Sequence, residues 1–117
     1  MANTFKLVTQ ATMPDSAGTA DAIYTTPSST TTIVNSLVIA NIHTADVTVD
    51  VKVESDTSGG GRTATNGNVT LLDGVSVPVG TSIDVLHKLV LETTDVLKVD
   101  CSVADKVSVT LSILEIT

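Results

Sequence analysis

Cys101, His43 and His87 are the residues whose types suit nucleophilic or metal-binding chemistry. A thiol and an imidazole act together only within hydrogen-bond reach, and the three residues are well separated in the sequence. Cys101 is in phase with Leu97 and Val99 in an alternating segment, which favours a small buried side chain. We therefore predict no catalytic residue and no enzymatic activity.

The sequence also predicts no metal or cofactor site. Structural zinc needs four closely organised Cys or His ligands, and the chain has three such residues without paired spacing. Aspartates are plentiful, but no Asp-x-Asp-x-Asp loop with a distal glutamate appears, so calcium is less favoured than a solvated acidic surface.

Gly59, Gly60, Gly61 and Arg62 resemble a phosphate-binding loop only superficially. The Lys-Ser/Thr pair and the strand-to-helix context of a nucleotide loop are both missing. The surrounding segment, residues 55–68, is rich in glycine and poor in apolar residues, which is typical of a protruding loop between strands. The four residues are candidates for binding a partner.

The elements that would position these residues are predicted to be strands. Thr, Val and Ile supply 20, 18 and 7 of the 117 residues, and such β-branched side chains favour strands over helices. Apolar and polar residues alternate from Val47 to Glu54, from Val96 to Val103 and from Val107 to Ile113. We expect a single antiparallel β-sandwich, jelly-roll-like, of about eight strands.

Three local features complete this prediction. The segment 31–41 is apolar on both alternating faces and is expected to be a central strand covered on both sides. Asp73-Gly74 is expected to form the turn of a tight hairpin, and the apolar neighbours Ile113 and Leu114 indicate a bulge in the last strand.

The expected core between the two sheets draws on four alternating segments. It consists of Leu37, Ile39, Val49, Val51, Leu97, Val99, Val109 and Leu111.

Residues 1–12 are interpreted as an N-terminal arm or a first strand, and residues 13–117 as the sandwich domain. Phe5, Leu7 and Val8 are more apolar than a free tail requires, so they are the candidate clamp on a partner. Of the two interpretations, the clamp on a neighbouring molecule is the one that we favour from the sequence.

The net charge of the chain limits the classes of molecule that it is expected to bind. Thirteen acidic and six basic residues give a net charge of -7, the wrong sign for binding phosphates or anionic lipid. Neither nucleic acid nor a membrane is expected as a partner. A single cysteine and the lack of a secretory signal at the start of the sequence fit assembly in a reducing cytoplasm.

Two stretches, Ile23 to Asn41 and Val75 to Glu92, carry a likeness to a known group, together with the closing segments 95–99 and 112–116. They resemble the small virion structural proteins of tailed bacteriophages, especially phages of cyanobacteria and other aquatic bacteria. The likeness covers most of the chain from Ile23 onward, and the loop at residues 55–68 is its divergent part.

The resemblance implies a capsid cement or decoration protein without catalytic residues. It implies the major capsid protein or other virion proteins as partners, assembly in the bacterial cytoplasm and a final location in the virion. Symmetric shells place copies side by side, so a homo-oligomer is expected, with a trimer favoured. The alternatives are a neck, tail or baseplate protein, and a receptor- or glycan-binding β-sandwich module.

Overall fold

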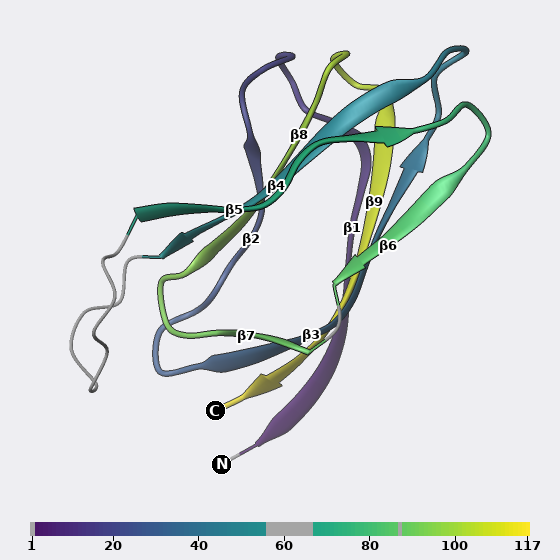
Figure 1. Ribbon diagram of the computed structural model, residues 1–117. Helices are drawn as coiled ribbons and strands as arrows, with labels where there is room; N and C mark the ends of the chain where they lie inside the picture. The colour runs from purple at the N-terminus through teal and green to yellow at the C-terminus, as the bar shows by residue number, and fades with distance from the viewer. Residues whose placement is uncertain (1, 56–66, 87) are drawn as a thin grey trace.

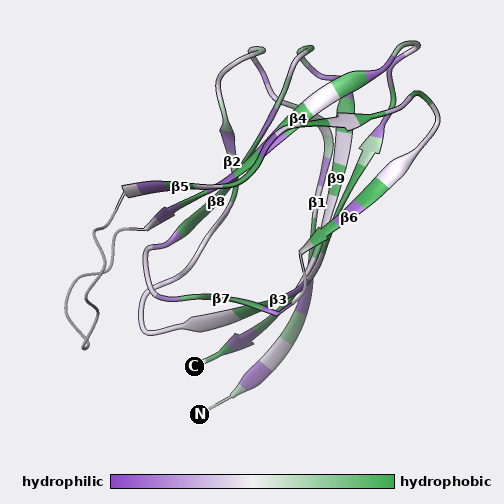
Figure 2. Ribbon diagram, in the orientation of Figure 1, coloured by the Kyte–Doolittle hydropathy of each residue, from purple (hydrophilic) through white to green (hydrophobic). Residues whose placement is uncertain are grey.

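Strand β4 (Val47–Ser55) shows how alternation in the sequence produces the fold. Val47, Val49 and Val51 are buried, whereas Thr48 is exposed and Asp50 is half-buried. Figure 2 shows hydrophobic and more hydrophilic segments following one another along the strands. Successive side chains of a strand point to opposite faces, so one face of β4 packs in the core and the other meets solvent. The other alternating segments form strands for the same reason.

The computed structural model describes residues 2–55, 67–86 and 88–117 and contains nine strands in that part of the chain. Sheet A has the order β1 (Asn3–Met13), β9 (Val107–Ile116), β3 (Thr31–Asn41) and β6 (Ser82–Leu86), and β7 (Leu89–Leu91) also pairs with β3. Sheet B has the order β2 (Asp21–Thr25), β8 (Val96–Cys101), β4 and β5 (Gly67–Val77). Figure 1 shows the two sheets facing each other, with both chain ends at the same end of the sandwich.

The strands pair as in a jelly roll, in which a long antiparallel hairpin is wound into two sheets. β1 pairs with β9, β2 with β8, β3 with β6 and β7, and β4 with β5, all antiparallel. The first half of the chain thus pairs with the second half in reverse order, which is jelly-roll topology. The predicted all-β antiparallel sandwich is confirmed.

One hydrophobic core lies between the sheets, and all eight residues predicted for it are buried. Their exposed fractions are at most 1%. The core also includes Met13, Val34, Val47, Val77, Leu91, Cys101, Val107 and Ile113. Cys101 is a free, buried cysteine, as its alternation predicted.

The predicted hairpin turn at Asp73-Gly74 is wrong, because β5 runs unbroken through both residues. Val49 pairs with Val75 and Val51 with Leu72, so Asp73 and Gly74 together lie opposite Asp50. This is a β-bulge, and Gly74 adopts the positive φ of 63° that a bulge residue often needs. The Asp50 carboxylate accepts the Gly74 N–H at 2.5 Å and fixes the bulge.

The bulge predicted in the last strand lies instead on its partner. Burial alternates without a slip along β9, so that Ile113 and Glu115 both point inward. The register shift is in β3, where Asn35 is the extra residue between Val34 and Ser36. β3 is central in sheet A as predicted, but its outer face is only half-buried.

Candidate interaction surface

β1 is the first strand of sheet A and forms one of its edges. Its residues pair with β9 in an unbroken register from Asn3 to Gln10. Of the two interpretations of residues 1–12, the structure therefore shows a first strand paired within this chain, and the role of this strand as a clamp on a neighbour stays a prediction. The strand reaches to Met13, whose side chain is buried in the core.

The three apolar candidates of β1 point in two directions. Phe5 and Leu7 lie on the outer face and are 77% and 67% exposed. Val8 pairs with the buried Leu111 and packs partly against the core. Phe5 and Leu7 are therefore available to a partner, whereas Val8 anchors the strand to its own sandwich.

The predicted partner-binding residues Gly59, Gly60, Gly61 and Arg62 lie outside the described residues, as does His87. The predicted loop 55–68 is described only at its ends, where Ser55 closes β4 and Gly67 and Asn68 open β5.

The outer face of sheet A is uncharged apart from one residue. We define the neutral face as the outward-pointing residues of its strands, which the paired registers place in line with one another and which alternate with the inward-pointing residues. Asp84 is the one charged member of this set, which consists of Asn3, Phe5, Leu7, Thr9, Thr31, Ile33, Ser36, Val38, Ala40, Ser82, Asp84, Val90, Ser108, Thr110, Ser112, Leu114 and Ile116.

An apolar row crosses the neutral face from one strand to the next. Phe5 pairs with Leu114, Leu114 with Ile33, and Ile33 with Val90, so the row spans β1, β9, β3 and β7. Val90 is 55% exposed. A monomeric sandwich usually places polar and charged side chains on a solvated sheet face, so an apolar row here indicates a contact surface.

The outer face of sheet B has the opposite character. Asp50, Lys52 and Glu54 of β4 point to this face, and so do Lys98 and the buried Asp100 of β8. Lys98 forms an ion pair with Glu54 across the two strands. The charge of the molecule is thus concentrated away from the neutral face.

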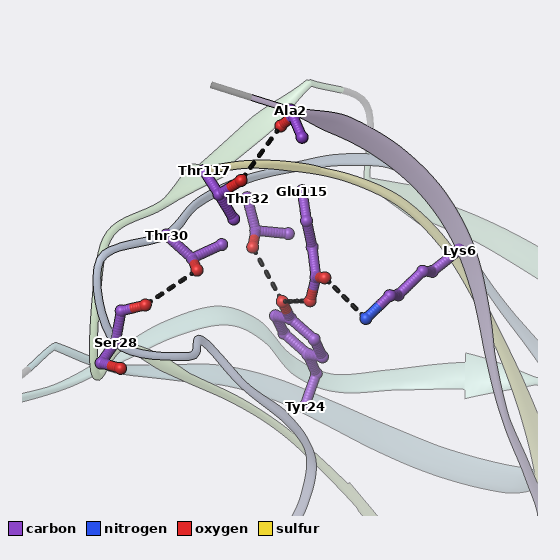
Figure 3. A network of polar contacts seen from close by, with 8 residues as sticks. All are labelled: Ala2, Lys6, Tyr24, Ser28, Thr30, Thr32, Glu115 and Thr117. Carbon is purple, nitrogen blue, oxygen red and sulfur yellow. Dashed lines mark hydrogen bonds and ion pairs between the residues drawn. The ribbon is translucent and has the colours of Figure 1, made fainter.

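A partly buried polar network holds β1 against the rest of the sandwich (Figure 3). The Lys6 ammonium lies 2.7 Å from the Glu115 carboxylate, and the Tyr24 hydroxyl donates to the other carboxylate oxygen at 2.6 Å. The Thr32 and Tyr24 hydroxyl oxygens are 2.8 Å apart. Because Tyr24 belongs to sheet B and the other three to sheet A, the network joins the two sheets near the chain ends.

The network perturbs two ionisable groups. The hydrogen bond from Lys6, followed by that from Tyr24, lowers the pKa of Glu115. Burial, followed by the hydrogen bond to the Glu115 carboxylate, raises the pKa of Tyr24 to about 12. Both shifts favour a charged Glu115 and a neutral Tyr24 at neutral pH.

The sequence pattern did not reveal this network, because the apolar neighbours Ile113 and Leu114 suggested a slip in facing just before Glu115. A charged residue at an inward position of a strand was the available signal, since a buried carboxylate needs a charged or hydrogen-bonding partner. The chain's one tyrosine, Tyr24, was the obvious donor, but no local pattern connected it to Glu115.

A groove of about 370 Å³ opens between β7 and the ends of β4 and β5. Its described lining is mostly aliphatic, with two carboxylates and a serine: Val53, Ser55, Val69, Leu71, Leu89, Val90, Leu91, Glu92 and Asp95. The Asp95 carboxylate accepts the Glu92 N–H at 3.0 Å and so belongs to the turn. The described lining lacks the aromatic ring on which a sugar or base stacks.

Within the described ranges, no group of three or more His, Cys, Asp or Glu residues is arranged to hold a metal ion. The same part of the chain has no helix with the length and hydropathy needed to cross a membrane. No protein-family model and no curated protein matches the sequence.

Proposed function

We propose that this chain is a non-enzymatic structural protein of a bacteriophage virion, a capsid cement or decoration protein that stabilises the shell. It contacts the major capsid protein, or other virion proteins, by burying apolar and backbone surface across their junctions. The chain is assembled in the host cytoplasm and ends in the virion.

The neutral face is the observation that carries this proposal. It offers an uncharged sheet surface with the row of Phe5, Leu114, Ile33 and Val90 across four strands. Docking the apolar row removes apolar area from water, and Asp84 is the one charged residue of the face that such a contact would meet, so the cost of desolvating charges is small.

The assignment to a virion rests on the resemblance of the segments from Ile23 onward to small virion structural proteins of tailed bacteriophages. Jelly rolls occur in viral capsid proteins, but also in lectins and cupins, so the topology is compatible with the proposal without selecting it. The trimer expected from shell symmetry stays a prediction.

Copy number separates the capsid from other positions in the particle. Quantitative mass spectrometry of purified virions is expected to find hundreds of copies of this chain. About six to eighteen copies would move it to the neck, tail or baseplate, where low-order rings set the number.

A binding assay tests the neutral face directly. We expect the wild-type chain to co-sediment with capsids stripped of it, and Val90→Glu to weaken that binding, because a carboxylate would be buried against the shell. Val79→Glu is the matched control, since Val79 is 51% exposed in a turn outside the neutral face. Equal binding by both variants would contradict a role for this face.

The glycan-binding alternative makes a different prediction. A glycan array that shows specific binding, lost when Gly59 to Gly61 are deleted, would replace the structural proposal. The aliphatic lining of the groove favours the structural role over this one.

A further inference from the structure

The edge strands of the two sheets differ in how well they are protected against pairing with a strand of another chain. β6 and β2 have five residues each, and β7 has three. β5 is as long as β1 but has two register shifts along its pairing with β4. Short strands and bulges are the usual means by which proteins prevent an edge from pairing with another chain.

β1 has little of this protection. It has eleven residues, its one register shift lies near its end, between Gln10 and Met13, and it keeps one register with β9 from Asn3 to Gln10. In an antiparallel pair every second residue directs its backbone groups away from the partner strand, so the outer side of β1 presents a regular row of donors and acceptors.

Charge distinguishes β1 from the other edge strands of five residues or more. β2, β5 and β6 carry Asp21, Asp73 and Asp84, respectively, whereas β1 has no acidic residue, and β7, which has none either, is only three residues long. Its one charged side chain, Lys6, is paired with Glu115 of the same molecule. Two copies of a chain with a net charge of -7 repel each other at their acidic surfaces, so β1 is the edge at which they can approach most closely.

We propose that β1 pairs antiparallel with β1 of a second copy around a two-fold axis. A strand that pairs with itself in this way is self-complementary, because each copy supplies the same donors and acceptors. Phe5 and Leu7 of both copies then lie on one continuous outer face, where cross-strand apolar pairs add to the main-chain hydrogen bonds. The neutral faces of the two copies become one surface.

The size of this contact makes the pair weak. Eight paired residues extend about 27 Å, and a strip about 12 Å wide gives roughly 300 Å² per partner, well below the ~800 Å² per partner of a standard interface. The pair therefore forms in a concentration-dependent equilibrium. The edge geometry favours a two-fold pair over the trimer expected from shell symmetry, and this inference holds whether or not the chain belongs to a virion.

Analytical ultracentrifugation of the isolated chain over a concentration series tests the pair. The average mass is expected to rise from 12.0 kDa toward twice that value, and to rise further at high salt, where repulsion between the copies is screened. Phe5→Glu/Leu7→Glu is expected to weaken the dimer about tenfold or more, because like charges are brought together. Both side chains are mostly exposed, so the fold is retained.

Ile42→Glu/Val79→Glu is the matched control, with the same added charge on two exposed residues outside β1. Val90→Glu separates edge pairing from packing through the neutral face. Both controls are expected to dimerise like the wild type. Amide hydrogen exchange in β1, but not in β2 or β6, is expected to slow as concentration rises.

Four results would overturn the inference. They are a wild-type monomer at every concentration and salt level, a dimer that survives Phe5→Glu/Leu7→Glu, a dimer that Val90→Glu disrupts equally, and a trimer.

Discussion

At the level of single residues, the core tolerates no charge on the inner face of β4. Val51 is 0% exposed, whereas Thr48 is exposed on the opposite face. Val51→Asp replaces a buried side chain with an unpaired carboxylate, so we expect a loss of about 3 kcal/mol or more in unfolding free energy. Thr48→Asp is expected to change it by about 0.5 kcal/mol or less. Equal midpoints in urea denaturation would refute this assignment of faces.

Glu115 makes the unfolding free energy depend on pH in the acidic range. Its pKa is lowered in the folded state, so the unfolded chain binds a proton first as the pH falls. Stability is therefore complete above the ordinary value of 4.5 and declines as the pH drops through the folded pKa. Glu115→Gln is expected to cost at most about 1 kcal/mol at pH 7, because Lys6 is half exposed.

Urea denaturation of the wild type and Glu115→Gln between pH 7 and pH 3 measures this contribution. The difference between the two proteins is expected to shrink as the pH falls. A constant difference across the range would show that the charge on Glu115 contributes nothing.

Tyr24 provides a direct optical readout of the same network, because it is the only tyrosine in a chain without tryptophan. Spectrophotometric titration is expected to give a midpoint near 12 in the folded protein and near 10 in denaturant. Since the folded pKa is raised, stability is complete below pH 10 and declines as the pH rises above it. Glu115→Gln is expected to lower the folded midpoint without restoring it to 10, because burial is the larger cause.

At the level of elements, β1 is part of the fold and not an appendage. Removing residues 1–12 exposes the backbone edge of β9 and deletes the contacts of Val8 with the core and of Lys6 with Glu115. We therefore expect the truncated chain to melt at a markedly lower temperature or to fail to fold. Phe5→Ser/Leu7→Ser is the control and should melt like the wild type, since both side chains lie outside. A truncated chain with an unchanged melting temperature would contradict this expectation and support the clamp interpretation.

At the level of the whole molecule, the two ends of the chain meet. Ala2 donates to the Thr117 carbonyl at 3.1 Å, and Thr117 donates to the Ala2 carbonyl at 2.9 Å. A linker of about three residues can therefore join the ends without distorting β1 or β9. Cyclisation is expected to add about 2–4 kcal/mol by reducing the entropy of the unfolded chain.

Thermal denaturation of the cyclised chain, compared with a linear chain that carries the same linker residues, measures this gain. A melting temperature no higher than that of the linear chain would mean that the ends are not held together in solution.

The local period of two determined the strands and their inner faces, because side-chain direction in a strand depends only on position along it. Val47 to Val53, Leu97 to Cys101 and Val107 to Leu111 could therefore be assigned from the sequence alone. The same pattern says nothing about which strands pair. Asp73-Gly74 is a typical turn dipeptide, but pairing of β5 with β4 places Gly74 in a bulge. The bulge that the sequence predicted at Ile113 lies instead at Asn35 of β3.

The candidate surface depended still more on tertiary structure. Phe5 could be recognised as unusual in the sequence, but its row with Leu114, Ile33 and Val90 exists only because β1, β9, β3 and β7 lie side by side. Lys6 and Glu115 come from opposite ends of the chain, and Tyr24 reaches them from the other sheet. A jelly roll joins residues that are distant in sequence, so the sequence determined which residues face inward, and the pairing of the strands decided which of them meet.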